Sequence, residues 1–314
     1  MHECFVTIPV YNRGCMSMRS GFVALAGRPN AGKSTLINSL IGEKVAIVSS
    51  KPQTTRSEIR GIYTDEECQI IFTDTPGIHK PKFRLESRMN KEAADVIQGV
   101  DLIYLVVDAS VPYAKGDEFV LNMVKNTGLP VFLILNKMDK MEPEKIVKVI
   151  QQWQERYDFA EYFPLSAKFG RSFEDLVKTT RKYLPEGDLL YPAEMTSDGA
   201  ENFRIAELIR EKILTQTEDE FPHAAAVLIE NKEFKKDKVY IQAMILVERD
   251  SQKGIMIGKQ GQMLKKIGSL AREDIEKLLG KKVFLELFVR VENEWRSRDA
   301  RITEYGYGGA SRDE

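Results

Sequence analysis

The residues GRPNAGKS, 27–34, lie between a short apolar run and a helical pattern. This spacing of two glycines, a lysine and a serine is typical of a phosphate-binding loop, whose backbone N–H groups surround an anion at a helix N-terminus. In such a loop Lys33 reaches the β- and γ-phosphates of a nucleotide, and the Ser34 hydroxyl binds Mg²⁺. A chance glycine turn is the alternative, which the flanking strand and helix patterns disfavour.

The loop belongs to a region, residues 18–184, in which short apolar runs alternate with longer helical patterns. Strands are predicted at Phe22–Ala26, Ile59–Thr64, Gln69–Thr73, Leu102–Val107, Val131–Leu135 and Tyr162–Pro164. Helices are predicted at 33–41, 86–98, 117–126, 143–157 and 172–183. This alternation predicts an α/β domain whose mostly parallel sheet is covered by helices on both faces.

Three further motifs follow predicted strands of this domain: DTPG at 74–77, NKMD at 136–139 and SAK at 166–168. In the first, Asp74 suits a carboxylate that holds Mg²⁺ through water, and the Gly77 amide suits the γ-phosphate. In the second, a carboxylate can accept hydrogens from N1 and the 2-amino group of guanine, which adenine does not offer. In the third, a backbone amide can reach guanine O6. Together with the phosphate loop they predict a site for GTP.

The polar segment SSKPQTTRSE, residues 49–58, lies between the phosphate loop and DTPG. Nucleotide switches need a hydroxyl here that binds Mg²⁺ only while the γ-phosphate is present. We expect Thr55 to be this ligand, with Thr54 as the alternative and an ordinary polar loop as the third interpretation.

The composition of the 314 residues, with 43% hydrophobic and 30% charged residues and a net charge of −1, is typical of a globular protein. No apolar run approaches the ~18 residues of a membrane-spanning helix. Three cysteines without metal-ligand spacing predict a reduced, cytoplasmic location. Residues 1–17 lack a signal-peptide pattern, and we expect a disordered extension with Met16 or Met18 as the usual start.

A second domain is predicted after the linker 185–202, which contains Pro, Gly and acidic residues without periodicity. Its expected elements are a helix at 203–216, strands at Ala224–Glu230 and Lys238–Val247, helices near 252–257 and at 262–279, and a strand at Val283–Val291. The order α-β-β-α-α-β is that of a type II KH domain, an α+β fold, which we place at 203–297. Residues 298–314 are expected to be disordered.

A GxxG loop, Gly258 to Gly261, lies between the two later helices of this domain. Its glycines permit close approach to a nucleic-acid backbone, and a KH loop of this kind holds about four nucleotides of a single strand. The sequence from Ser251 to Arg290 contains nine Lys and Arg residues and four Asp and Glu residues, a net charge of +5. A helix hairpin with solvated lysines is the alternative. The predicted RNA-binding residues are Lys253, Ile257, Gly258, Lys259, Gln260, Gly261, Lys265 and Lys266.

The motifs together resemble the Era family of bacterial GTPases. In the first domain the resemblance rests on GRPNAGKSTLIN, PQTTR, DTPGIHKP, NKMD and SAK. In the second it rests on EFPHAAAVLIE, IGKQGQMLKKIGSLAREDIEKLLG and KVFLELFVRVENEWR. It spans about residues 20–296, and the chain departs from the family pattern mainly at its two ends.

The resemblance implies GTP hydrolysis with Mg²⁺, and binding to the 3′ end of 16S rRNA, including the CCUCC region, during assembly of the 30S subunit. It also implies peripheral association with the inner face of the cell membrane. We expect a monomer in which GTP and Mg²⁺ order the 48–58 and 75–90 segments and thereby control RNA access to the KH domain. The residues expected to bind the nucleotide are Gly27, Arg28, Pro29, Asn30, Ala31, Gly32, Lys33, Ser34, Thr35, Asp74, Thr75, Pro76, Gly77, Ile78, Asn136, Lys137, Met138, Asp139, Ser166, Ala167 and Lys168.

Ile78 stands where many small GTPases carry a glutamine that orients the attacking water. The Era family, which this chain resembles, has an apolar residue at this position. The resemblance therefore implies that the protein is an active GTPase despite Ile78. Relatives with an asparagine at the position of Asn30 bind K⁺ beside the phosphates, which implies a K⁺ site at Asn30 and the carbonyls of the 48–55 loop. The expected catalytic set is Lys33, Asn30, Thr55 and Gly77, and the Mg²⁺ set is Ser34, Thr55 and Asp74.

Two other functions fit parts of the pattern. A KH scaffold with a purely structural nucleotide predicts GTP binding without turnover and no mutual effect of GTP and RNA. A GTPase that acts on membranes or in tRNA modification is disfavoured, since neither a basic amphipathic helix nor a catalytic cysteine motif is present.

Overall fold

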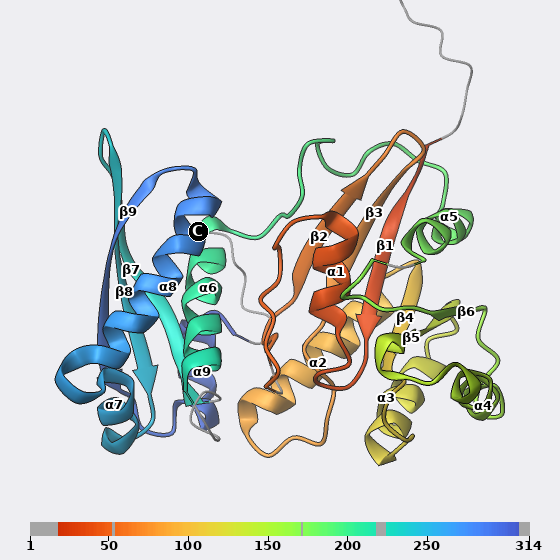
Figure 1. The fold of residues 1–314 in the computed structure, drawn as a ribbon, viewed down its shortest axis with the longest axis horizontal. Helices are drawn as coiled ribbons and strands as arrows, with labels where there is room; N and C mark the ends of the chain where they lie inside the picture. The colour runs from red at the N-terminus through yellow and green to blue at the C-terminus, as the bar shows by residue number, and fades with distance from the viewer. Residues whose placement is uncertain (1–17, 52–53, 171, 218–223, 308–314) are drawn as a thin grey trace, which may run out of the picture.

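A computed structural model describes residues 18–51, 54–170, 172–217 and 224–307, and the expectations for residues 1–17 and 308–314 lie outside this part of the chain. Figure 1 shows the N-terminal domain on the right and the C-terminal domain on the left, joined across the top by the segment before α6. No helix in the described residues combines the length and the apolar character that crossing a membrane requires.

The N-terminal domain is built on a six-stranded sheet in the order β2-β3-β1-β4-β5-β6, in which only β2 is antiparallel to its neighbour. The strands are β1 (Arg19–Ala26), β2 (Ile59–Thr64), β3 (Cys68–Asp74), β4 (Leu102–Asp108), β5 (Val131–Asn136) and β6 (Glu161–Pro164). Their runs of buried residues fit a sheet covered on both faces. The predicted α/β class is confirmed.

Two helix layers cover this sheet, and each layer has its own apolar core. The first layer contains α1 (Lys33–Ile41) and α5 (Phe173–Tyr183). The second contains α2 (Arg84–Gln98), α3 (Lys115–Lys125) and α4 (Pro143–Gln154). In α2 the buried Leu85, Met89, Ala93 and Ile97 recur at four-residue spacing, which forms one apolar stripe.

The C-terminal domain has a three-stranded sheet in the order β7-β8-β9, antiparallel and then parallel. Figure 1 shows two long helices against one face of this sheet. The elements are α6 (Glu201–Gln216), β7 (Ala226–Phe234), β8 (Lys238–Val247), α7 (Asp250–Ile257), α8 (Gln262–Leu279) and β9 (Lys282–Val291). The predicted α-β-β-α-α-β order is therefore confirmed.

The end of the described chain is folded, which corrects the expectation of disorder from residue 298. A 3-10 turn at Trp295–Ser297 leads into α9 (Asp299–Glu304), and Tyr305 and Tyr307 are both 4% exposed. These side chains form an apolar cluster with Trp295 and with Leu85 of α2. The segment lacks apolar periodicity because it packs as separate aromatic anchors between the domains.

The linker 185–202 follows the edge of the first sheet. The Ile62 N–H of edge strand β2 donates to the Thr196 carbonyl at 2.9 Å, and Gly61 pairs with Ser197. The linker thus supplies partners to an edge strand, whose polar backbone groups otherwise need water.

Candidate functional site

The phosphate loop connects β1 to α1 in a conformation that needs glycine at two positions. Gly32 has φ +98°, and a side chain there would place its Cβ 2.2 Å from the Asn136 amide nitrogen. At Gly27 a Cβ would lie 2.4 Å from the Val106 carbonyl oxygen. Only glycine allows the loop to curl this closely over the carboxyl ends of the strands. The loop therefore directs its backbone toward the N-terminus of α1.

The three oxygens proposed for Mg²⁺ meet beside this loop. The Ser34 hydroxyl donates to Asp74 Oδ2 at 2.6 Å, and the Thr55 hydroxyl donates to the same atom at 2.8 Å. The two hydroxyl oxygens are 3.0 Å apart. Thr55 is buried, whereas the Thr54 hydroxyl donates to the Lys51 carbonyl instead. The arrangement thus favours Thr55 over Thr54 as the switch hydroxyl.

Burial acts on both charged groups at this position. Burial lowers the pKa of Lys33, although the nearby Asp74 carboxylate opposes the shift. Burial also raises the pKa of Asp74, which Lys33, Ser34 and Thr55 oppose. Asp74 Oδ1 is buried and has no hydrogen-bond partner among the residues that the structure describes. Because oxygen ligands and a carboxylate at this position suit Mg²⁺, the residues fit the ion, which would satisfy that oxygen through a bound water.

Asn136 connects the two loops that are predicted to bind the guanine base with the phosphate loop. Its Nδ2 donates to the Ala31 carbonyl at 2.9 Å, and its Oδ1 accepts from the Ala167 N–H at 2.9 Å. The Ser166 hydroxyl donates to the Asp139 carboxylate. Hydrogen bonds therefore join NKMD and SAK to the phosphate loop, and the Ser166 hydroxyl orients the Asp139 carboxylate.

Lys137 joins the same network from the other direction. It has φ +65°, and its ammonium group contacts the Asn30 carbonyl at 2.7 Å and the Asp108 carboxylate at 2.6 Å. Ser110 also donates hydrogen bonds to Asp108. Partial burial opposes the shift, but the hydrogen bonds from Lys137 and Ser110 lower the pKa of Asp108. The base-recognition motif thus also fixes the first half of the phosphate loop.

Several predicted residues line a small hollow over the loop: Pro29, Asn30, Gly32, Lys33, Ser34, Thr35, Thr55 and Gly77. Asn30 Nδ2 donates to the Ser50 carbonyl at 2.8 Å, which ties the phosphate loop to the 48–55 loop. Others act from outside the hollow: Arg28 pairs with Asp117 at 2.9 Å, and the Thr75 hydroxyl donates to the Leu25 carbonyl.

Ile78 faces away from the nucleotide hollow. Its side chain is fully buried in the core beneath α2, and its N–H donates to the Gly27 carbonyl at 3.3 Å. It therefore anchors the DTPG loop, and its predicted contact with nucleotide can come only through its backbone. The neighbouring His79 ring contacts the Gly77 carbonyl at 2.8 Å and Glu86 at 3.6 Å.

The GxxG loop of the second domain has the shape that close backbone approach requires. Gly258 has φ +72°, and a Cβ there would lie 2.7 Å from the Met263 Cβ. Gln260 and Gly261 also have positive φ. The loop opens beside a groove of about 370 Å³, lined by Gly261, Leu264, Lys265, Gly268, Ser269, Arg272, Phe284, Leu285 and Leu287.

The groove differs from the predicted RNA-binding set. Lys265 lines it, whereas Lys253 and Lys266 do not. Its helix wall lies outside the predicted set, although Gly268 was a signal in the sequence because glycine is unfavourable in a helix interior. The absence of a side chain at Gly268 leaves room for Leu287 across the groove, since a Cβ there would lie 3.3 Å from the Leu287 side chain.

The loop that carries Thr55 is bound directly to the second domain. The Val48 N–H donates to Glu211 at 3.0 Å, and Arg210 donates to the Thr54 carbonyl. The Arg56 guanidinium donates to the Ala225 carbonyl at 2.6 Å. Both residues adjacent to Thr55 in the sequence are thus held by the C-terminal domain.

Arg56 occupies an aromatic box. It is 1% exposed, and its guanidinium carbon lies 6.0 Å from the centroid of Trp295 and 5.7 Å from that of Tyr307. Burial and the nearby Arg210 lower the pKa of Arg56 to about 10, so it stays charged at neutral pH. A buried cation held by a carbonyl and two rings makes this contact demanding in geometry.

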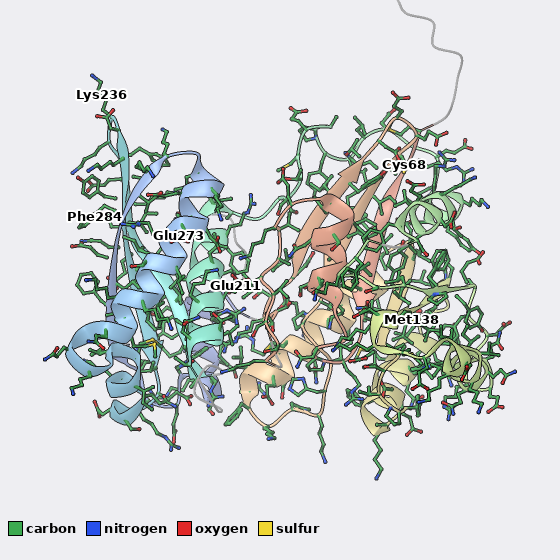
Figure 2. The ribbon with its side chains drawn as sticks, in the orientation of Figure 1. Cys68, Met138, Glu211, Lys236, Glu273 and Phe284 are labelled. Carbon is green, nitrogen blue, oxygen red and sulfur yellow. The ribbon has the colours of Figure 1, made fainter. Side chains whose placement is uncertain are left out.

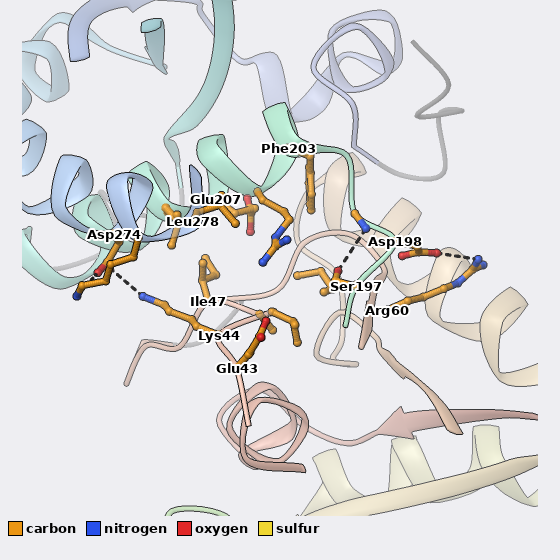
Figure 3. Close-up of a pocket in the computed structure, with 17 residues that line it drawn as sticks. Glu43, Lys44, Ile47, Arg60, Ser197, Asp198, Phe203, Glu207, Asp274 and Leu278 are labelled. Atoms are coloured by element: carbon orange, nitrogen blue, oxygen red, sulfur yellow. Dashed lines mark hydrogen bonds and ion pairs between the residues drawn. The ribbon is translucent and has the colours of Figure 1, made fainter. Parts of the chain in front are cut away.

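A cavity of about 430 Å³ lies between the domains beside this contact (Figure 3). At one end Lys44 pairs with Asp274 at 3.1 Å and with Glu211 at 2.5 Å. At the other end Arg60 pairs with Asp198 of the linker at 3.2 Å. The cavity is therefore bounded by ion pairs that join the first domain to the linker and to α8.

Comparisons with known proteins cover both domains. A family model described as 50S ribosome-binding GTPase matches residues 22–137, and a KH domain model matches residues 220–296. The chain is 38% identical to Aquifex aeolicus Era in a crystal structure with GDP·AlF4⁻, with a TM-score of 0.89, covering 92% of this chain and 99% of that chain. It is 39% identical to Era in complex with MgGDPNP and nucleotides 1506–1542 of 16S ribosomal RNA, with a TM-score of 0.90 and the same coverage.

Proposed function

Because this chain belongs to the Era family, we propose that it is a GTP-hydrolysing switch that binds the 3′ end of 16S rRNA and assists assembly of the 30S subunit. The observation that carries the proposal is the contact between the two sites. The switch hydroxyl Thr55 lies in the nucleotide site, and both neighbouring residues are bound by the RNA-binding domain. A change at either site therefore reaches the other through one loop.

Hydrolysis forms a bond from a water oxygen to the γ-phosphorus and breaks the bond from that phosphorus to the β–γ bridging oxygen. Magnesium, when bound, neutralises charge on the β- and γ-phosphates. The chain supplies the loop amides, the buried Lys33 cation and the Gly77 backbone around the transferred group. Electrostatic preorganisation of this kind needs no side-chain base, so the apolar Ile78 is compatible with turnover.

A K⁺ ion beside the phosphates is part of the proposal. The Asn30 side-chain oxygen and the Ser50 carbonyl oxygen, which accepts from Asn30 Nδ2, are the kind of oxygen ligands that K⁺ would take. The ion would add positive charge where the transition state develops negative charge. We expect faster turnover in KCl than in NaCl at matched ionic strength, and equal rates would remove K⁺ from the mechanism.

Coupling follows from the two states of the 48–56 loop. The Thr55 hydroxyl would hold Mg²⁺ beside GTP, and the loop would then favour the geometry that the C-terminal domain accepts. Without the γ-phosphate this ligand would be released, and the Arg56 and Arg210 anchors would hold a less fixed loop. The nucleotide state thus biases the position of the groove.

The test is GTP turnover in KCl with a single-stranded RNA from the 3′ end of 16S rRNA and with a scrambled RNA of equal length. We expect stimulation by the cognate RNA alone. Turnover without any RNA effect would keep the GTPase and break the coupling. Bound GTP without turnover in either reaction would instead support a KH scaffold with a structural nucleotide.

We further propose a cytoplasmic monomer, since its ribosomal partner resides in the cytoplasm. Peripheral contact with the inner face of the membrane is the expectation that the resemblance adds. Cell fractionation at low and high salt, with light scattering of the purified protein, tests the three statements separately. Recovery only with membranes at every salt concentration would contradict a cytoplasmic pool.

A further inference from the structure

The sheet of the C-terminal domain exposes aromatic side chains on the face opposite its long helices. Phe284 and Phe288 are 50% and 46% exposed. Phe284 pairs in register with Tyr240, and their ring centroids are 5.4 Å apart. Figure 2 shows Phe284 pointing away from α6 and α8. We call Tyr240, Phe284 and Phe288 the outer aromatic strip.

The strip is the part of this face that other elements leave open. At one end of the same face, Leu246 and Met244, which pairs in register with Phe288, pack against Trp295 and the residues around α9. A fold that only needed a solvated sheet surface would place polar residues at the open end. Isolated exposed apolar residues are common, but neighbouring rings on one strand pair indicate a binding surface.

Cations border the strip. The Lys235 ammonium lies 4.2 Å from the centroid of Tyr240, and alternation along the strands places Lys238, Lys282 and Arg290 on the same face. The carboxylates beside the strip have partners among the described residues: Glu286 accepts from Gln242 at 2.8 Å, and Glu233 lies 3.7 Å from Lys235. Rings with surplus cations match the bases and phosphates of a single strand.

The strip is continuous with the groove beside the GxxG loop. Strand β9 is an edge strand, with the groove wall formed by Leu285 and Leu287 and the strip formed by the alternate residues. Phe284 contributes to both. An RNA strand that leaves the groove across β9 therefore reaches the rings directly.

We propose that the outer aromatic strip is a second RNA surface, on which unpaired bases next to the groove-bound segment stack. A KH groove holds about four nucleotides, so a longer single strand has bases left to place. Stacking accepts any base, because every base has an aromatic face. The strip thus increases the affinity for RNA and sets the path of the strand beyond the groove, while the groove provides sequence specificity. This inference rests on the proposed RNA-binding function.

The test compares two RNAs with one double variant, Tyr240→Ala with Phe288→Ala, which leaves the groove-lining Phe284 in place. One RNA is the short segment that fills the groove, and the other extends it by about six unpaired nucleotides. We expect about ten-fold weaker binding of the long RNA and unchanged binding of the short RNA. The matched control is Phe234→Ala, because Phe234 is 56% exposed but pairs with the inward-facing Val239.

Each other outcome would contradict the proposal that the outer aromatic strip binds RNA. Equal affinity of variant and wild type for the long RNA would do so, as would an equal loss for both RNAs, which would indicate damage to the groove. A variant with unchanged RNA binding but reduced self-association or vesicle binding would assign the face to another occupant. If the wild type bound neither RNA, the proposed function itself would fail, so the two failures are distinguishable.

Discussion

Two of the polar contacts between the C-terminal domain and the GTPase domain differ in burial. At the loop before β2, Arg56 and Arg210 are 1% and 0% exposed and bind carbonyl oxygens of the opposite domain. At α2, Arg84 pairs with Asp299 of α9 at 3.0 Å, with both side chains more than half exposed. Water can replace the exposed Arg84–Asp299 ion pair but not the buried hydrogen bonds of Arg56 and Arg210.

This difference indicates that the two contacts do different work. The buried contact holds the residues on both sides of Thr55, so the proposed coupling runs through it. The exposed ion pair adds a weak, salt-dependent attraction to the buried apolar cluster that Leu85 and Met89 of α2 form with Ile302 of α9. Coupling between the domains should therefore depend on the first contact and tolerate loss of the second.

Arg56→Ala should have the largest effect. It leaves the Ala225 carbonyl without this donor and empties the box of Trp295 and Tyr307, at a cost on the order of 3 kcal/mol in the docking of the domains. Because Thr55 loses an anchor, we expect about ten-fold slower GTP turnover and no stimulation by cognate RNA.

The control for this change is Arg156→Ala, since Arg156 also stacks on a ring, 4.3 Å from the centroid of Tyr113, but within the GTPase domain. It should leave RNA stimulation intact. If Arg56→Ala kept both turnover and RNA stimulation, the buried contact would be structural only.

Tyr307→Ala should have a smaller effect on the same contact. It removes one ring from the Arg56 box and from the cluster around Trp295, which we expect to cost about 1–2 kcal/mol of domain docking. RNA stimulation of turnover should fall about three-fold or more. Tyr157→Ala is the control, because Tyr157 packs near Lys125 away from the second domain. Identical behaviour of the two variants would contradict a role for the end of the chain.

The contact between Arg56 and its aromatic box could not be predicted from the sequence. The PQTTR motif predicted Thr55 as the switch hydroxyl, but Arg56 had no pattern that marks a buried cation. The aromatic partners lie about 240–250 positions away, and Tyr307 sits in a stretch rich in glycine and charge, which was predicted to be disordered. No local periodicity encodes a contact between one loop and separate aromatic anchors.

The nucleotide site was more accessible to prediction because its motifs each follow a strand. The carboxyl ends of parallel strands meet at one edge of the sheet, so DTPG, NKMD and SAK had to converge on the phosphate loop. The groove beside the GxxG loop was harder to predict. Its loop has a motif, whereas its walls depend on which faces of α8 and β9 oppose each other, as Gly268 and Leu287 do.

The ion pairs beside the buried contact have intermediate burial and predict a pH dependence. Hydrogen bonds from Lys212 and Lys44 lower the pKa of Asp274 to about 2, although partial burial opposes the shift. A lowered carboxyl pKa contributes stability above the unfolded value near 4, and this contribution is lost as the pH falls from about 4 to 2. Because solvent screens the pair, we expect Asp274→Asn to lower the free energy of unfolding by about 1 kcal/mol at pH 7.

Denaturant unfolding of both proteins at several pH values measures this contribution. The difference between wild type and variant should shrink toward zero near pH 2. Glu276→Gln is a useful comparison, since Glu276 pairs with Lys282 inside the C-terminal domain. A constant difference from pH 7 to pH 2.5 would show that packing, and not charge, explains the effect.

Asp299→Asn should have the smallest effect. The carboxylate is 55% exposed and pairs with Arg84, and it lies 3.8 Å from Arg88, so its loss should change docking by less than about 0.5 kcal/mol. The change should vanish in high salt, where exposed charges are screened, and RNA stimulation of turnover should persist. Turnover measured at low and high ionic strength in parallel with Arg56→Ala makes the contrast direct. If Asp299→Asn abolished stimulation as Arg56→Ala is expected to, burial would not be what separates the two contacts, and α9 would act on the nucleotide site through α2 instead.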